Sequence, residues 1–411
     1  MTTHEVIVVG GGIGGLTTAA LLSARGVNVC LLERGEKVGG CASSFEKFGY
    51  KFELGYGIYS GWNESEIHTR VFQELKTEPP KTKLLKPSYI VRLPDGFEIP
   101  ISNDQKEVEE YLRSAFPECV DTAARFSSHR FNRFITAQQH IFGNQTNKQL
   151  HTIEGGAESL ANALVESIKR NGGVVRLNSP VLRLAFDTNG KAVGVDLLNG
   201  ERIGFTKAVV SNLTVWDTFG RLIGLNRTPG DVRQKLKDFH GKGAYQMFLS
   251  IDEEILNALP SKRILALSDW EGELEESLFM FSASPNAHDG KCAVTVSTFV
   301  NVENWFQFQE SQDAIEEMDQ EHLEKVWRRL HLMIPELGDG VEIIETFTPR
   351  DFYELTRRRL GTVFTKSNKS FSFKTHLPNV FIVSDTITND WGITAVSELA
   401  LEVANEIAPQ S

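Results

Sequence analysis

The chain has no excess of positive charge, few cysteines and no long apolar run. It contains 43 Lys and Arg against 54 Asp and Glu, which gives a formal net charge of −11. This balance argues against nucleic acid as a partner, because phosphates require a basic face. It also disfavours electrostatic attachment to anionic lipid, whereas a peripheral membrane contact through apolar side chains stays compatible with it.

The cysteines are too sparse for a disulfide framework or a zinc site, and no metal is expected. They are Cys30, Cys41, Cys119 and Cys292, and none forms a C-x-x-C pair. No apolar run reaches the roughly 20 residues of a membrane span. A strand pattern that starts at Val6 leaves no room for a signal or transit peptide. We therefore expect a reduced, cytoplasmic protein, and its 411 residues fit two domains.

The first thirty-three residues form the pattern of one βαβ unit. Residues 6–9 are a β-branched run, residues 16–24 read as a helix, and residues 29–33 are a second buried strand. Gly10, Gly12 and Gly15 fill G-x-G-x-x-G between the strand and the helix, where they permit a tight turn, close approach to a pyrophosphate and close helix packing.

Glu33 ends the second strand eighteen residues past Gly15, where its carboxylate can accept both ribose hydroxyls and would repel a 2′-phosphate. The alternative to a dinucleotide site is a glycine-rich turn that binds no ligand. The complete order of strand, turn, helix, strand and acid disfavours it and predicts a dinucleotide site.

The continuation favours FAD over NAD. Arg34 is followed by a Gly-Gly pair within residues 39–45 and by G-x-x-x-E-x-G at residues 49–55. Here the chain resembles the FAD-dependent amine oxidase and phytoene desaturase superfamily, in which this second loop wraps the pyrophosphate and ribityl chain. Residues 154–160, 178–181, 209–212 and 381–396 resemble further parts of its fingerprint.

The resemblance implies a set of cofactor-binding residues spread over the whole chain. They are Gly10, Gly12, Ile13, Gly14, Gly15, Glu33, Arg34, Gly39, Gly40, Cys41, Ala42, Ser43, Val181, Asp385, Gly392, Ile393 and Thr394. In this set Val181 would contact the adenine, Asp385 the ribityl hydroxyls or a phosphate-bound water, and the helix that starts near Thr394 the flavin pyrimidine edge. Ser384 departs from the family, which usually has Gly there.

The implied fold class is α/β, with a Rossmann-like FAD-binding domain of the glutathione-reductase type interleaved with an α+β substrate domain. We expect residues 1–75, 150–232 and 345–411 to form the FAD-binding domain. Residues 76–149 and 233–344 would form the substrate domain. Asn-Gly pairs at 189–190 and 199–200 predict hairpin turns, and residues 314–332 and 395–407 predict helices.

Within the superfamily, residues 43–45 and 49–53 resemble the carotenoid desaturase, carotenoid isomerase and retinol saturase branch. This implies desaturation, saturation or isomerisation of a small apolar, isoprenoid-like substrate by hydride transfer at flavin N5. The absence of a catalytic triad or carboxylate dyad fits chemistry carried by the flavin, and no catalytic residue is assigned. The sequence names no electron acceptor.

Two other functions stay open. A flavin amine oxidase acting on a small molecule would frame the flavin with aromatic side chains, for which Tyr56, Tyr59 and Trp391 are candidates, although core packing is favoured for each. Core packing is likewise favoured for the aromatic stretches at residues 131–142 and 305–308. A non-catalytic binder of prenylated proteins, of the kind that Rab GDP-dissociation inhibitors represent, is disfavoured because the glycine fingerprint is intact.

Overall fold

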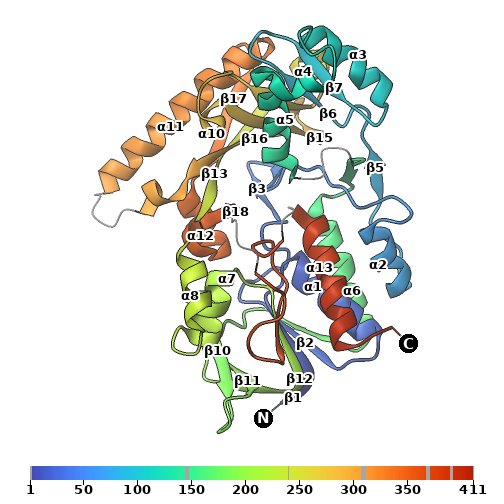
Figure 1. Ribbon diagram of the computed structural model, residues 1–411, viewed down its shortest axis with the longest axis vertical. Coiled ribbons are helices and arrows are strands. Elements are labelled where there is room, and N and C mark those ends of the chain that lie inside the picture. Colours follow the sequence, from blue (N-terminus) through green and yellow to red (C-terminus); the bar gives the residue numbers. More distant parts are fainter. Residues whose placement is uncertain are drawn as a thin grey trace.

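The described residues form two large β-sheets with helices on both of their faces (Figure 1), together with two small two-stranded sheets. The computed structural model describes residues 2–143, 148–238, 240–306, 312–366, 371–388 and 392–410. The lower sheet in Figure 1 contains the first strand of the chain, and the upper sheet is crossed by the long helix α11.

The first sheet joins strands from three distant parts of the sequence. They are β1 (Thr3–Val9), β2 (Val29–Leu32), β9 (Val174–Arg176), β10 (Val181–Phe186), β11 (Ala192–Leu197), β12 (Arg202–Ser211) and β19 (Val380–Ile382). Strands β9, β2, β1, β12 and β19 run parallel, in that order, and β10 and β11 add an antiparallel meander at the start of β12. The meander turns contain Gly190 and Gly200 at φ +80° and +86°, which confirms the predicted hairpins.

Helices cover the parallel sheet because its strands are apolar on both faces. On one face lie α1 (Ile13–Ala24), α2 (Ile67–Leu75), α6 (Ala157–Arg170) and α13 (Gly392–Ile407), which share one buried cluster with β1 and β2. On the other face lie α7 (Val215–Asp217), a π-helix (Thr218–Gly224) and α8 (Gly230–Lys237). This arrangement is Rossmann-like, as predicted.

The second sheet is mostly antiparallel and has eight strands. They are β6 (Tyr89–Arg92), β7 (Glu98–Ile101), β13 (His240–Asp252), β14 (Arg263–Leu267), β15 (Leu278–His288), β16 (Lys291–Asn301), β17 (Val341–Phe347) and β18 (Thr362–Lys366). Strand β18 pairs with β13 in this second sheet, although it belongs to residues 345–411, which we expect in the FAD-binding domain. The boundaries between the two domains stay a prediction.

Two sets of helices pack on this sheet. One face carries α9 (Glu253–Ala258), α11 (Gln312–Met333) and a 3₁₀ turn (Pro335–Leu337). The other face carries α3 (Gln105–Ala115) and α5 (His129–Phe142), and α4 (Thr122–Ser127) lies against α5. The remaining elements near this sheet are α10 (Leu274–Ser277), α12 (Pro349–Thr356) and 3₁₀ turns at Val302–Phe306 and Arg359–Gly361.

The remaining described strands form two short antiparallel pairs. They are β3 (Ser44–Lys47) with β4 (Tyr50–Glu53), and β5 (Thr82–Leu84) with β8 (His151–Ile153). Phe45 and Phe52 from the first pair pack against Phe248 and Phe347 of the second sheet, with ring centroids 4.7 to 5.2 Å apart. This aromatic cluster fixes the segment that follows the Gly-Gly pair against the second sheet.

Most described aromatic residues of the two stretches predicted as core are buried, whereas Phe131 and Phe306 are half-buried. Phe134, Ile141 and Phe142 of α5 are at most 8% exposed, and Trp305 is 1% exposed, whereas Phe308 lies outside the described residues. Across the described ranges, no helix is both long and apolar enough to span a membrane. Nor does this part of the chain contain a cluster of three or more side chains able to hold a metal ion.

Candidate cofactor-binding site

The glycine-rich turn after β1 tolerates no side chain at its key positions. A Cβ on Gly12 would lie 2.6 Å from Asn212 Oδ1, and one on Gly15 would lie 2.2 Å from the carbonyl oxygen of Gly10. Gly10 itself has φ +104°. The turn is therefore close-packed backbone that leads into the N-terminus of helix α1, whose first N–H groups lack partners within the helix, the arrangement that binds a diphosphate.

Asn212 holds this turn from the neighbouring strand, and sequence reasoning missed it as an individual residue. Its backbone N–H donates to the carbonyl of Val9 at 2.8 Å, and its side-chain Nδ2 donates to the carbonyl of Val383 at 2.5 Å. Asn212 thus ties the ends of β1, β12 and β19 together beneath the glycines. In the sequence, only the position of Asn212 at the end of a buried strand indicates this role.

Glu33 lies beside the turn, as its place at the end of β2 predicts. Its Oε2 accepts the N–H of Gly11 at 2.6 Å, and its Oε1 accepts the N–H of Gly35 at 2.8 Å. The carbonyl oxygens of Glu33 and Gly35 accept the N–H groups of Ser179 and Asn178. Residues 178–181, including Val181, therefore lie next to the expected ribose position, and Arg34 instead points to the carbonyl of Leu355 at 2.6 Å.

The second glycine pair packs directly on the first turn. The N–H of Gly39 donates to the carbonyl of Gly11 at 2.8 Å, and a Cβ on Gly40 would lie 3.4 Å from Gly12 Cα. Residues 39–43 close into a tight turn, in which Ala42 N–H and Ser43 Oγ donate to the carbonyls of Gly39 and Gly40. Two glycine loops that meet in this way form a backbone cradle for a pyrophosphate.

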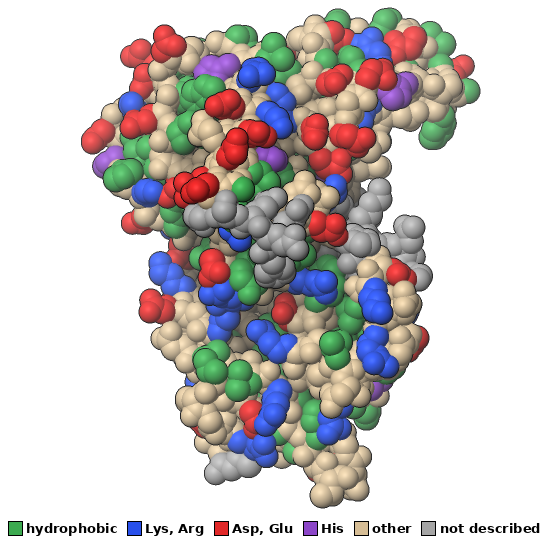
Figure 2. Space-filling model, turned by 90° about the vertical axis from the view of Figure 1, so that its left-hand side faces the viewer, with side chains coloured by type: hydrophobic (Ala, Val, Ile, Leu, Met, Phe, Trp, Pro, Cys, Tyr) green, Lys and Arg blue, Asp and Glu red, His purple; other side chains and the backbone are tan. Residues whose placement is uncertain are grey.

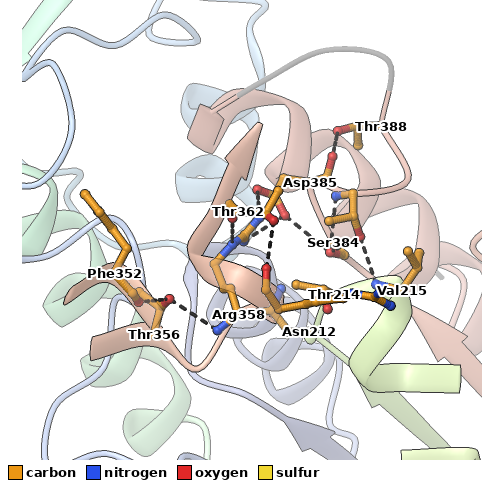
Figure 3. Close-up of polar contacts among 12 residues, drawn as sticks. Asn212, Thr214, Val215, Phe352, Thr356, Arg358, Thr362, Ser384, Asp385 and Thr388 are labelled. Atoms are coloured by element: carbon orange, nitrogen blue, oxygen red, sulfur yellow. Dashed lines mark hydrogen bonds and ion pairs between the residues drawn. The ribbon is translucent and has the colours of Figure 1, made fainter. Parts of the chain in front are cut away.

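Asp385 is held by Arg358, the middle one of three consecutive arginines (Figure 3). Arg358 Nη1 and Nη2 donate to the two oxygens of Asp385 at 3.1 and 2.9 Å, and Arg358 Nε donates to the carbonyl of Thr362 at 2.6 Å. Burial alone would lower the pKa of Arg358, but the Asp385 carboxylate outweighs it and the pKa is raised. The guanidinium of Arg358 therefore stays charged.

Cys41 lies beside this ion pair. Burial raises the pKa of its thiol, and the Arg358 guanidinium opposes that shift, partly through a hydrogen bond. Arg358 consequently joins two predicted cofactor segments, residues 39–43 and residue 385. Ser384 Oγ lies 2.8 Å from Thr386 Oγ1, which gives this departure from the family a local structural role.

The start of α13 lies next to the start of α1. A Cβ on Gly14 would lie 3.3 Å from Val396 Cβ, so the first turns of the two helices touch. Thr394 is 2% exposed and its Oγ1 lies 2.8 Å from Ser60 Oγ, so its side chain is held in place rather than open to solvent. Two helix N-termini side by side favour an anionic ligand at this end of the sheet.

Two of the three aromatic residues that are candidates to frame the flavin, Tyr56 and Tyr59, lie in the described part of the chain. Tyr59 donates its hydroxyl to Glu53, and burial raises the pKa of Tyr59 well above its ordinary value. Tyr56 packs against the apolar face of the second sheet, and its carbonyl accepts Ser282 Oγ at 2.7 Å. Trp391 lies outside the described residues.

Acidic charge is concentrated away from the cradle. Between residues 241 and 340 there are 19 Asp and Glu and 7 Lys and Arg, so the rest of the chain is close to neutral. On the face shown in Figure 2, Asp and Glu gather on the upper part and Lys and Arg on the lower part. The negative net charge therefore does not oppose binding of a diphosphate.

Comparison with known proteins identifies the family. The family described as flavin containing amine oxidoreductase matches residues 108–357, and an NAD(P)-binding Rossmann-like domain matches residues 8–75. The chain belongs to the flavin-containing amine oxidoreductases. It is an FAD-dependent oxidoreductase, which confirms the expected family and cofactor, and the cradle fits the diphosphate of that cofactor. The individual FAD contacts stay predictions.

Three similar proteins illustrate the range of the family. Prolycopene isomerase 2 of an Oncidium hybrid cultivar is 22% identical over 98% of this chain and 84% of its own length. The all-trans-retinol 13,14-reductase of Danio rerio is 22% identical over 84% of this chain and 74% of its own. The solved structure of cyclohexylamine oxidase from Brevibacterium oxydans IH-35A shares the fold, with a TM-score of 0.63, 14% identity, and coverage of 98% of this chain and 99% of that one.

Proposed function

We propose that this protein desaturates, saturates or isomerises an apolar, isoprenoid-type substrate. The full-length similarity to a prolycopene isomerase and to a retinol reductase supports this substrate class. The observation that carries the proposal is the apolar character of the second sheet where it meets the segment after residue 55. Tyr56 and Ile58 join a cluster there that includes Tyr89, Met280 and Phe299.

In this proposal the protein positions the cofactor and the substrate and excludes water from the reaction. Bound FAD supplies the redox chemistry by accepting or returning a hydride. The cradle of residues 10–15 and 39–43 holds the diphosphate, and Asp385 orients the ribityl chain. The apolar cluster behind Tyr56 keeps water away from this side of the site, which suits a reaction that needs little acid–base assistance.

The test is anaerobic reduction of the flavin by candidate substrates. Purified protein saturated with FAD is mixed with all-trans-retinol, a carotene or cyclohexylamine, and the flavin absorbance is followed. We expect bleaching by a polyene and not by the amine. Because an isomerase is redox-neutral and a saturase consumes reduced flavin, the dithionite-reduced protein is also incubated with all-trans-retinol and with cis-carotenes, and the products are separated by chromatography. Failure of all polyenes in both assays would contradict the proposal.

Amine oxidation is the second candidate, and the family match favours it. Tyr56 and Tyr59 follow the predicted pyrophosphate loop, where an amine oxidase would place an aromatic side chain. The hydroxyl of Tyr59 is engaged by Glu53. Flavin bleaching by cyclohexylamine alone would make this the function.

A further inference from the structure

Glu53 is a half-buried carboxylate that joins three segments of the chain. It ends β4, the second strand of the pair that follows the glycine loop at residues 39–43. The hydroxyl of Tyr59 donates to it, and its Oε2 lies 3.5 Å from the N–H of Ala157 at the start of α6. A Cβ on Gly156 would lie only 2.9 Å from Glu53 Cδ, so the carboxyl group packs directly against the N-terminal end of that helix.

The groups around Glu53 leave it able to take up a proton. Burial raises its pKa, and the neighbouring hydrogen bonds and cations oppose that shift without cancelling it. The cations are Lys51 on β4 and Arg263 on β14, which act on the carboxylate through space. Burial and the Glu53 carboxylate raise the pKa of Tyr59 well above its ordinary value, so the hydroxyl of Tyr59 keeps its own proton. Glu53 is therefore the group of this cluster that can gain and lose a proton.

Tyr59 links Glu53 to the expected flavin edge. Its backbone N–H donates to the carbonyl of His151 at 2.8 Å, and its carbonyl accepts the N–H of His151 at the same distance. The next residue, Ser60, has its Oγ 2.8 Å from Oγ1 of Thr394, which we expect at the pyrimidine edge of the flavin. The backbone of Tyr59 is thus fixed one residue from that edge, while its hydroxyl contacts Glu53.

One side of this segment is accessible. Glu53, Tyr56 and Tyr59 each keep part of their surface accessible, whereas Leu54 and Ile58 between them are buried. The Glu53–Tyr59 pair can therefore exchange a proton without any opening of the apolar core.

We propose that Glu53 holds the proton that accompanies the hydride: it takes up a proton through the Tyr59 hydroxyl when FAD is reduced and releases it when FAD is reoxidised. Reduced flavin carries a negative charge at the edge that Thr394 is expected to face, and a negative charge nearby favours the protonated form of a carboxyl group. Proton uptake by Glu53 offsets the charge that reduction adds to the site. Bound FAD is sufficient for this linkage, so it goes beyond the proposed substrate class.

The hydride and the proton balance in either direction of the reaction. In a desaturation the substrate loses a hydride to FAD and a proton to Glu53, so two C–H bonds break, one C=C bond forms and the flavin is reduced. In a saturation the same hydride and proton return to the double bond, and the flavin is oxidised.

The test is the midpoint potential of the bound FAD as a function of pH, measured from about pH 5 to about pH 9 by spectroscopic redox titration of the FAD-loaded protein. Over the pH interval in which Glu53 titrates, the wild type should take up one proton more per two electrons than Glu53→Gln, so its potential should fall more steeply with pH there. Glutamine keeps an oxygen that can accept the Tyr59 hydroxyl but does not ionise. Equal slopes in the two proteins at every pH would overturn the proposal.

Glu158→Gln is the matched control, because it removes the same charge from the first turn of α6. Hydrogen bonds from Ser44 and Lys51 lower the pKa of Glu158, so its carboxylate should stay ionised in both redox states. Its removal should shift the potential equally at every pH without changing the slope. A slope that changes as much in Glu158→Gln as in Glu53→Gln would indicate a general charge effect and refute the role of Glu53.

Tyr59→Phe provides a second test that keeps the carboxyl group. The hydrogen bond from the Tyr59 hydroxyl lowers the pKa of Glu53, so its removal should move the interval of steeper slope to higher pH. An interval that does not move would separate the hydroxyl from this proton and overturn the proposal. Both titrations use FAD and no substrate, so their outcome is separate from that of the flavin-bleaching assay for the proposed function.

Discussion

The Arg358–Asp385 pair offers a quantitative test of how the site is held. The side chains are 15% and 32% exposed, so the pair is largely withdrawn from water. Removing one partner of a fully buried pair costs about 3–5 kcal/mol, and the partial exposure of Asp385 reduces the expectation to about 2 kcal/mol. Arg358→Met and Asp385→Asn should each lower the free energy of unfolding of the FAD-free protein by that amount.

A double-mutant cycle then isolates the interaction. If the two groups stabilise each other, the double variant should lose less than the sum of the single variants, with a coupling of about 1–2 kcal/mol in urea unfolding followed by circular dichroism. Arg357→Met is the matched control, because Arg357 pairs with Glu354 at the surface, where a pair contributes about 0–1 kcal/mol. Strict additivity of the two single variants would refute the pairing argument.

Cofactor affinity provides the functional side of the same experiment. Loss of a charged hydrogen bond to the ribityl chain costs about 1.5–3 kcal/mol, so Asp385→Asn should raise the Kd for FAD roughly 10- to 100-fold. Arg358→Met should raise it as well by releasing the carboxylate, and Arg358→Lys should recover only part, since an ammonium lacks the fork. Unchanged affinity in Asp385→Asn would exclude its ribityl role.

Three further changes probe the cofactor, the core and the surface. Glu33→Ala should raise the Kd for FAD about 10- to 100-fold in flavin fluorescence titrations while the circular dichroism spectrum is retained; full flavin occupancy in the variant would contradict the ribose role. Burial lowers the pKa of His68 to about 3, so its neutral form stabilises the fold fully above pH 6.5 and less as the pH falls toward 3. His68→Phe should therefore reduce the loss of unfolding free energy between pH 7 and pH 5 by about 2 kcal/mol, and identical pH profiles would refute this. Val120 and Phe126 are 85% and 77% exposed. If they form a peripheral membrane contact, changing both to Asp should abolish pelleting with phosphatidylcholine vesicles. Equal pelleting of the wild type and of this double variant would exclude that contact.

Local patterns predicted the parts of the site that are made of consecutive residues. The turn between β1 and α1 follows from glycine spacing between an apolar strand and a helix, and Glu33 follows from the end of the next strand. These features could be predicted because a βαβ unit is built from neighbours in sequence. The contact between the loops at residues 11–12 and 39–40 required the family resemblance, since no local pattern brings two glycine turns together.

Arg358 and Arg263 show which features of the structure sequence patterns do not predict. Residues 357–359 are three consecutive arginines, and nothing in their identity distinguishes the middle one. The backbone does: Arg357, the residue that caps α12, and Leu360 both have φ +52°, so Arg358 lies in a bend between two residues in the left-handed conformation. The side chain of Arg358 then reaches Asp385, while Arg357 pairs at the surface.

Arg263 was hidden for a different reason. A charged residue at the first position of the short apolar strand at residues 263–267 ordinarily marks the exposed end of that strand. Here both faces of the second sheet are covered, and the face of Arg263 meets residues 53–59, which come from more than 200 positions earlier in the chain. Its burial is a product of the long-range packing of that segment on the sheet. The same packing brings its guanidinium near the carboxylate of Glu53, which acts on it through space, and no local sequence pattern signals that proximity.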